Sequence, residues 1–274
     1  MNSVGQTAVL PAIPQDELLL PAFTLWWREV VRFYRQRTRV VGVIASPVLF
    51  WVVIGSGFGN SLRPGASGES QPFLNYFYPG ALIMIVLFTS IFTMMSVIED
   101  RKEGFLLSVL VAPVSRSAIV LGKVLGGTTL STIQGLIFLV FAPFVGVHIG
   151  LGSWLLVGLT VFLVSFALTA LGFAIAWPMD SSQAFHAIIN LFLIPMWMLS
   201  GALFSLSHAS EWLRVVMQID PLTYGVEALR DLLYPGSQGQ FSLLASMSTL
   251  VLFSLFMFGL AFLMVNRRTT KPAA

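Results

Sequence analysis

The chain has 274 residues, of which 56% are hydrophobic and only 10% are charged, and its formal net charge is +3. Soluble domains carry about 25% charged residues, so a soluble protein of this composition would expose more apolar surface than one core can hide. The charges are also separated by five long uncharged stretches, of which the longest runs from Lys123 to Asp180. The composition therefore predicts an integral membrane protein with no nucleic-acid partner.

The first 21 residues contain three prolines and no basic segment followed by an apolar run. This pattern is not that of a signal peptide. We expect residues 1–21 to form a flexible cytoplasmic tail.

Residues 22–39 combine an apolar stripe with a basic one. Aromatic and aliphatic residues recur at helical spacing from Phe23 to Tyr34, and Trp26 and Trp27 are among them. The basic face carries Arg28, Arg32, Arg35 and Arg39. This pattern predicts an amphipathic helix in the bilayer interface, with its guanidinium groups towards lipid phosphates. A simple membrane anchor and a docking surface for a partner protein explain it equally well.

The uncharged stretches divide into membrane spans of about 20 residues, the length needed to cross a bilayer. Pro143, Gly146, Gly150 and Gly152 split the longest stretch in two. The sequence thus predicts an all-α polytopic protein with a transmembrane domain over 40–268 and a short cytoplasmic tail over 269–274. The six expected spans are 40–59, 76–98, 119–143, 153–177, 183–204 and 241–265.

The distribution of Lys and Arg predicts the orientation. If the amino terminus is cytoplasmic, 12 of the 15 basic residues lie on the inner side, leaving Arg63, Arg214 and Arg230 outside. The positive-inside rule therefore places both termini in the cytoplasm of a cell with this protein in its inner (plasma) membrane.

The segment after the second span, residues 98–127, begins with a group of charges and continues with an apolar piece, Phe105 to Val111, before Pro113. A two-turn cytoplasmic helix of this kind suits a lever on which another protein pushes. A simple re-entry turn would show the same spacing.

Two amphipathic patterns precede the last span. The first is the stripe of Trp212, Val215, Val216 and Ile219, and the second runs from Leu222 to Leu233 after Asp220-Pro221. We expect two short external helices that either rest on the outer leaflet or dip back into it.

The sequence carries no sign of catalytic chemistry. It has no cysteine, no GxxxxGK[ST] phosphate loop and no HExxH or GxSxG motif, and Gly122-Lys123 is followed by valine. The middle of each expected span lacks Asp, Glu, Lys and Arg, which argues against an ion-coupled carrier. We therefore expect no metal and no cofactor on this chain.

Three motifs resemble the membrane subunits of ATP-binding-cassette exporters of the type-2 class (type V fold), nearest to the daunorubicin-resistance and nodulation-factor permeases. These are YPGALIM at 78–84, EDRKEGFLLSVLVAPVSRSAIVLGKVLGG at 99–127 and DPLTYGVEALRDLL at 220–233. The last departs from the family's usual Asn-Pro-Leu at Asp220. The resemblance covers roughly residues 22–268.

The resemblance implies a permease that exports a hydrophobic or amphipathic substrate (a drug, lipid or glycoconjugate). Its partners would be a cytoplasmic ATPase subunit, which binds ATP and Mg, a second copy of itself or a related permease, and membrane lipids. The helix between spans two and three would couple to the ATPase, the interfacial helix with Arg28, Arg32 and Arg35 would flank it, and the 177–183 turn would be a second contact. The residues expected to couple to the ATPase are Glu99, Asp100, Arg101, Glu103, Gly104, Phe105, Leu107, Pro113, Arg116 and Asp180.

In the same family pattern, spans two and five would line the substrate path, beneath a lid formed by the external helices. The candidate lining residues are Phe88, Phe92, His186, Asn190, Met196 and Trp197. Packing between helices explains each one as well, and interhelical hydrogen bonding explains His186, Asn190 and Gln134. A secondary transporter or channel without an ATPase, and an intramembrane lipid-modifying enzyme, are the alternative functions.

Overall fold

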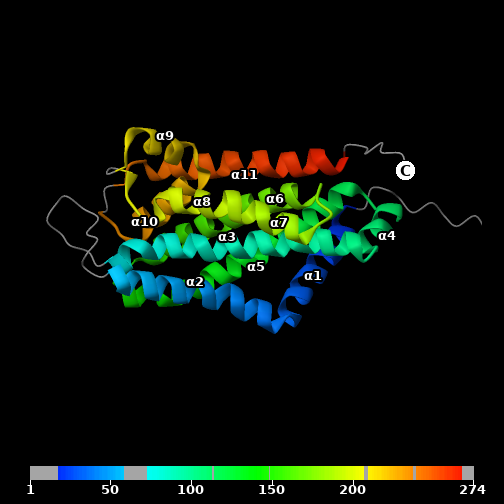
Figure 1. Ribbon diagram of the computed structural model, residues 1–274, viewed down its shortest axis with the longest axis horizontal. Helices are drawn as coiled ribbons and strands as arrows, with labels where there is room; N and C mark the ends of the chain where they lie inside the picture. The colour runs from blue at the N-terminus through cyan, green and yellow to red at the C-terminus, as the bar shows by residue number, and fades with distance from the viewer. Residues whose placement is uncertain are drawn as a thin grey trace, which may run out of the picture.

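The computed structural model describes residues 18–58, 73–112, 114–147, 149–206, 209–236 and 239–266, and all regular elements among them are helical. Long helices run side by side along one axis, with shorter helices at the two ends of the bundle (Figure 1). The short helix α4 (Phe105–Val111) marks one end, and α10 (Pro221–Leu233) marks the other. We call these the α4 end and the α10 end. Of the predicted tails, 1–21 and 269–274, residues 1–17 and 269–274 lie outside the described residues, and the first helix begins within the first tail, at Leu19.

Five helical segments in the described part of the chain are long and apolar enough to cross a membrane. The first predicted span lies in α2 (Arg37–Phe58), whose described apolar stretch, Pro47–Gly57, is shorter than the others. The polytopic all-α fold is therefore confirmed, and the count of six spans stays a prediction. The five segments are α3 (Phe73–Lys102), α5 (Arg116–Phe138) with η1 (Leu139–Val145), α6 (Leu151–Ala176), α7 to η3 (Ser182–Ala202) and α11 (Leu243–Asn266).

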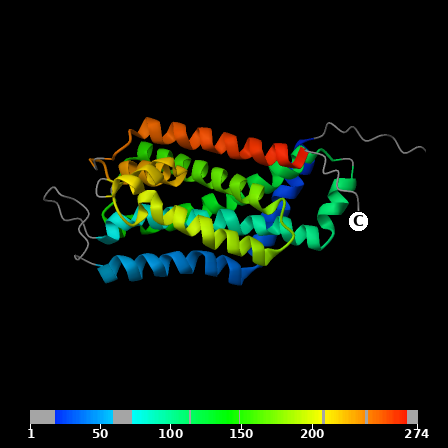
Figure 2. The ribbon, with the colours of Figure 1, turned by 45° about the horizontal axis from the view of Figure 1, so that its top comes forward.

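Helix α3 is the centre of the bundle, and α2, α5 and α6 pack around it. Lipid is as apolar as the helix surfaces, so the hydrophobic effect does not drive helices together inside a membrane, and their association depends on close packing. Small residues allow two helix backbones to approach closely. A Cβ at Gly127 of α5 would lie 2.6 Å from the Thr169 side chain of α6 and 2.8 Å from that of Met94 of α3. Figure 2 shows α2 along the outer edge of the bundle.

The fifth segment is irregular. It begins as α7 (Ser182–Ile188), where the Ser181 hydroxyl accepts the Ala184 N–H. It continues through the wider turns η2 (Ile189–Leu193) and η3 (Met198–Ala202), with α8 (Ile194–Trp197) between them. Gly201 has φ of +82°, a left-handed conformation that favours glycine, and the segment ends there.

At the α4 end, α1 (Leu19–Arg35) crosses the bundle obliquely (Figure 1). The chain turns at Gln36 and α2 starts at Arg37, so the interfacial helix ends four residues before the predicted boundary of 39. The short helix α4 spans Phe105–Val111, the predicted apolar piece, and follows Gly104, whose φ is +76°.

Both short helices at the α10 end form as predicted. The predicted stripe of α9 (Glu211–Ile219) is exposed, since Trp212 and Ile219 are 70% and 76% accessible. The stripe of α10 is instead buried against α6, α11 and η3. Helix α10 therefore packs into the bundle, whereas α9 keeps an apolar outer face, and whether either helix rests on or dips into the outer leaflet stays a prediction.

Candidate functional site

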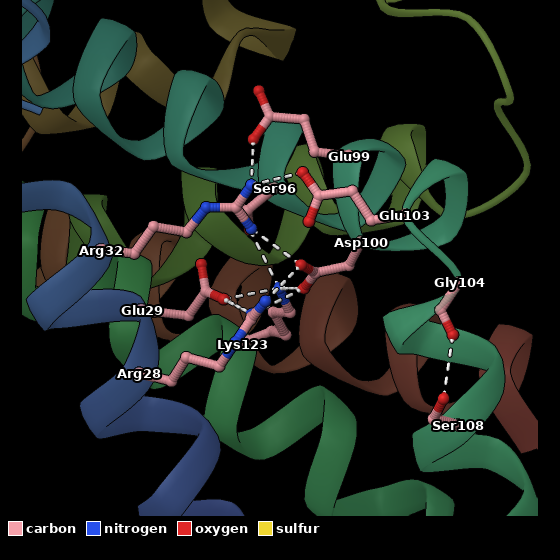
Figure 3. Close-up of polar contacts among 10 residues, drawn as sticks. All are labelled: Arg28, Glu29, Arg32, Ser96, Glu99, Asp100, Glu103, Gly104, Ser108 and Lys123. Atoms are coloured by element: carbon pink, nitrogen blue, oxygen red, sulfur yellow. Dashed lines mark hydrogen bonds and ion pairs between the residues drawn. The ribbon is translucent and has the colours of Figure 1, made fainter.

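A cluster of ionic side chains joins α1, α3 and α5 at the α4 end of the bundle (Figure 3). Its buried members are Glu29, Asp100 and Lys123, at most 5% exposed, and Arg28, Arg32 and Glu99 surround them. Buried charges are rare unless they are paired. We therefore take this ionic cluster as the candidate functional site at the α4 end.

Asp100 is the centre of the cluster and is fully buried. Its Oδ1 accepts hydrogen bonds from Arg28 Nη2 and Arg32 Nη1, each at 2.7 Å. Its Oδ2 accepts one from Arg28 Nη1 at 2.9 Å and another from Lys123 Nζ. One carboxylate of α3 thus holds two cations of α1 and one of α5.

Lys123 connects the cluster to a second buried carboxylate. Its Nζ donates to Glu29 Oε1 at 2.6 Å and to Ser96 Oγ at 3.1 Å. Arg32 also donates to Glu99 Oε2 at 2.7 Å. Each buried charge therefore has partners of opposite sign, the condition under which charges can leave water.

Glycines of α5 bring α1 close enough for these contacts. A Cβ at Gly122 would lie 2.7 Å from the carbonyl oxygen of Ala22 and from the Leu25 Cβ, and one at Gly126 would lie 2.8 Å from the Glu29 Cβ. The Trp26 Nε1 donates to Thr129 Oγ1 at 3.0 Å across the same contact. The packed face of α1 is thus Ala22, Leu25, Glu29 and Phe33, with Trp26 at its edge. The other aromatic residues of the predicted stripe, Phe23, Trp27 and Tyr34, are exposed on the other side.

The cluster also holds α4. The guanidinium of Arg28 lies 3.8 Å from the centre of the Phe105 ring. Leu106 is buried with Leu25 and Ile119. Leu107 and Val111 face outward and are 66% and 79% exposed. One face of α4 is therefore fixed to α1 and α5, and the other is an apolar surface with no partner among the described residues.

Arg101 ties the next loop to the same end of α3. Its guanidinium donates to the Met179 carbonyl at 2.7 Å, to the Trp177 carbonyl and to Asp180 Oδ1 at 3.0 Å. The 177–183 turn, predicted to be a second contact, thus lies against the end of α3 that precedes α4.

The structure brings most of the predicted coupling residues to this end. Glu103 is 61% exposed and lies 3.8 Å from Arg32, and Asp180 is 84% exposed. Arg116 donates to the Val265 carbonyl at 3.4 Å, which joins α5 to α11. Pro113 lies outside the described residues.

Two features of the cluster differ from the sequence interpretation. Arg28 and Arg32 point into the protein towards α3, and only Arg35 of the three predicted arginines is exposed. Burial lowers the pKa of Arg28, but the hydrogen bond and charge of Asp100 outweigh it and raise this pKa overall. Glu29 and Lys123 were not predicted as site residues. Their signal was a charge among apolar and small residues on one side of each helix, and Glu29 lies against Gly126.

The predicted path residues lie along α3 and the fifth segment. Phe88 stacks on Phe92, whose ring is 5.5 Å from that of His186. Trp197 donates from Nε1 to the Gly80 carbonyl at 2.8 Å. Met196 is partly buried and Asn190 is exposed.

An apolar groove of about 280 Å³ lies between α2, α3 and α8, lined by Pro47, Phe50, Met84, Leu87, Phe88, Ile194 and Trp197. Phe88 and Trp197 thus share one groove, and Phe92 and His186 contact each other beyond it.

A second ionic group lies at the α10 end. Arg230 pairs with Glu227, donates to the Gly201 carbonyl at 3.0 Å and lies 4.4 Å from the centre of the Tyr76 ring. Glu227 also accepts the Gln240 N–H at 3.1 Å. These contacts fix α10 to the start of α3 and to the end of the fifth segment. Among the described residues, no group of His, Asp or Glu could hold a metal ion.

Comparison with known proteins connects this architecture to transport. The family model described as ABC-2 type transporter matches residues 22–234. The protein ycf38 of Cyanophora paradoxa, named as a transport permease, is 28% identical over 80% of this chain and 76% of its own length. The inner membrane transport permease YadH of Escherichia coli strain K12 is 25% identical over 76% of this chain and 80% of its own. The daunorubicin resistance ABC transporter permease protein DrrB1 of Streptomyces coeruleorubidus is 19% identical over 76% and 73%.

Proposed function

The chain belongs to the ABC-2 type transporter family, and from this premise we propose that it is the permease subunit of an exporter driven by a separate ATPase. The exporter would move a hydrophobic or amphipathic compound across the inner membrane. ATP and Mg would bind the ATPase subunit, and this chain would bind neither. A second copy of the chain, or a related permease, would complete the path.

The observation that carries the proposal is that one face of α4 is packed on the bundle while the other is apolar and exposed. Its inner face is fixed to α1 and α5 through Phe105, Leu106 and the buried cluster, and its outer face exposes Leu107 and Val111. A force applied to that outer face would reach α3 through Arg28 and Asp100 without an intervening flexible segment. An ATPase that closes on ATP would thereby shift the bundle between inward-open and outward-open states.

The orientation and the substrate path complete the proposal. With α4 in the cytoplasm, both termini are cytoplasmic and α9 and α10 lie outside. The groove lined by Phe88 and Trp197 supports an apolar substrate, because its lining residues are all apolar. DrrB1, whose name refers to daunorubicin resistance, makes that compound a reasonable first probe.

The proposal predicts that transport requires a partner. An affinity-tagged chain purified from its native membrane should retain an ATPase subunit. Proteoliposomes that hold both subunits with their cytoplasmic side facing outward should take up daunorubicin only when ATP is present. The chain alone should show no ATP hydrolysis and no uphill uptake. Uphill uptake by the chain alone would instead establish a secondary transporter and refute the proposal. The matched control replaces ATP by a nonhydrolysable analogue.

The exposed face of α4 should be needed for coupling and not for folding. Leu107→Asp places a charge in the proposed apolar interface, and we expect transport to fall at least about tenfold, as when one apolar side chain is removed from a buried interface. The melting temperature should stay within about 2 °C of wild type, since the side chain is exposed. Leu107→Met keeps the exposed face apolar and is the matched control. Equal transport by Leu107→Asp and wild type would contradict the coupling role.

A further inference from the structure

The outer face of α1 is apolar and aromatic although its inner face already packs on the bundle. Leu19, Phe23, Trp27 and Tyr34 are between 46% and 76% exposed. Helices of soluble regions do not present a stripe of this kind to water, because each exposed aromatic ring forfeits the free energy of burial. Something apolar therefore covers this face.

An open depression of about 420 Å³ lies in this face, near the joint between α1 and α2. Trp27, Val30, Val31, Tyr34 and Arg35 line it. Two aliphatic side chains form its apolar part, two amphipathic rings flank them, and one guanidinium stands at the end. The depression thus offers an apolar middle for acyl chains and one cation at its edge for a headgroup.

Arg35 differs from the other two predicted arginines. Arg28 and Arg32 each bind carboxylates of α3. In the described ranges of the chain, Arg35 has no carboxylate within ion-pair distance, and its side chain is exposed. The charge that an anionic ligand would meet in this depression is thus Arg35.

We propose that this depression binds an anionic phospholipid, with Arg35 holding the headgroup phosphate and Trp27 and Tyr34 flanking the upper part of its chains. The positive charge of Arg35 and the position of the two rings at the membrane interface favour this ligand. Arg binds phosphate through paired N–H donors, and Trp and Tyr favour the membrane interface. A zwitterionic lipid carries the same phosphate but offsets its charge, so the site prefers anionic lipid.

The preference can be measured on the full chain in nanodiscs, without any ATPase. The chain has no cysteine, so Phe23→Cys gives one attachment point for a bimane fluorophore on the same face, one turn from Trp27. Quenching is compared between spin-labelled phosphatidylglycerol and spin-labelled phosphatidylcholine at equal mole fraction. Leu252→Cys on α11, 68% exposed, reports the ordinary lipid-facing surface.

We expect phosphatidylglycerol to be preferred about fivefold at position 23, the value for one cation near an anionic surface, and not at position 252. Arg35→Gln should bring the ratio near one, and Arg35→Lys should keep most of it. Lys102→Gln removes an exposed cation at the same end of the bundle and should change nothing.

Three results would overturn the proposal. Equal quenching by both lipids at position 23 shows that no anionic site exists. An equal loss in Lys102→Gln and Arg35→Gln shows a diffuse surface charge. Absence of quenching by either lipid shows that protein, and not membrane, covers this face. Because no outcome involves nucleotide or transport, failure here leaves the proposed permease function untouched.

Discussion

Asp100→Asn is expected to lower the free energy of unfolding by about 3–5 kcal/mol, the cost of removing one partner from a buried ion cluster. The wild-type carboxylate accepts from Arg28, Arg32 and Lys123. An amide keeps one acceptor oxygen and turns an N–H₂ group towards a cation, so three positive charges lose their shared counterion. Tryptophan fluorescence during denaturant unfolding in detergent measures the loss.

Asp180→Asn is the matched control at the same end of the bundle. Asp180 also pairs with an arginine, at 3.0 Å, but is 84% exposed. Exposed pairs contribute about 0–1 kcal/mol. If Asp100→Asn is no more destabilising than this control, the cluster does not hold the three helices together.

A second variant separates lost attraction from stranded charge. Asp100→Asn leaves the cluster with one more cation than carboxylates. Lys123→Met combined with Asp100→Asn removes that excess charge and replaces the lysine with a side chain that packs. The double variant should be less destabilised than Asp100→Asn alone, because an uncompensated buried charge costs more than an absent pair. A loss equal to the sum of both single variants would contradict this account.

The cluster also explains why the helix boundaries were easier to predict than the site. The bounds of α4 follow from local features, a glycine before the helix and an uninterrupted apolar run, and these are visible in the sequence. The partners of Arg28 and Arg32 lie in α3, about 70 positions away, and hydropathy carries no information about them. The arginine row therefore predicted a lipid contact for side chains that the fold turns inward.

The same reason applies at the α10 end. Two amphipathic stripes of equal quality preceded the last span, yet Leu222 is buried and Trp212 is exposed. Periodicity identifies the apolar face of a helix but not what covers it. The cover of α10 is the bundle itself, whereas α9 retains an outer face. The same holds for the predicted substrate path. Phe88 and Trp197 share a groove that α2 also lines, although the sequence motifs assigned the path to spans two and five alone.

The joint between α9 and α10 is built on a buried carboxylate, Asp220, which stands where the family pattern has Asn. It is 6% exposed, and its Oδ1 accepts the Leu222 N–H at 2.9 Å. Among the described residues, its buried Oδ2 has no hydrogen-bond partner. A carboxylate with one unsatisfied oxygen in an apolar setting favours the protonated acid.

Burial raises the pKa of Asp220 to about 7, although the Leu222 N–H opposes this by lowering it. Between about pH 4 and pH 7, the folded chain keeps a proton that the unfolded chain has released. Because the folded state then binds more protons, the free energy of unfolding falls as the pH rises through this window. Above pH 7 both states are ionised at this position, and the loss is complete.

Asp220→Asn should therefore abolish this pH-dependent loss of the free energy of unfolding. The amide keeps an oxygen for the Leu222 N–H but cannot ionise. We expect the variant to exceed wild type by up to about 4 kcal/mol at pH 8, equivalent to roughly three pKa units, and to differ by less than about 1 kcal/mol near pH 4. Melting temperatures measured from pH 4 to pH 8 give the difference at each pH.

Glu211→Gln, at the exposed start of α9, provides the control for this experiment. It removes a carboxylate from the same end of the bundle but not from a buried site, so its pH profile should follow that of wild type. A pH-independent gain in Asp220→Asn would mean that the amide packs better and that no proton is involved. If instead only Asp220→Asn flattens the profile, the joint of α10 loosens when Asp220 ionises, and the stability of the α10 end depends on the pH of the compartment that it faces.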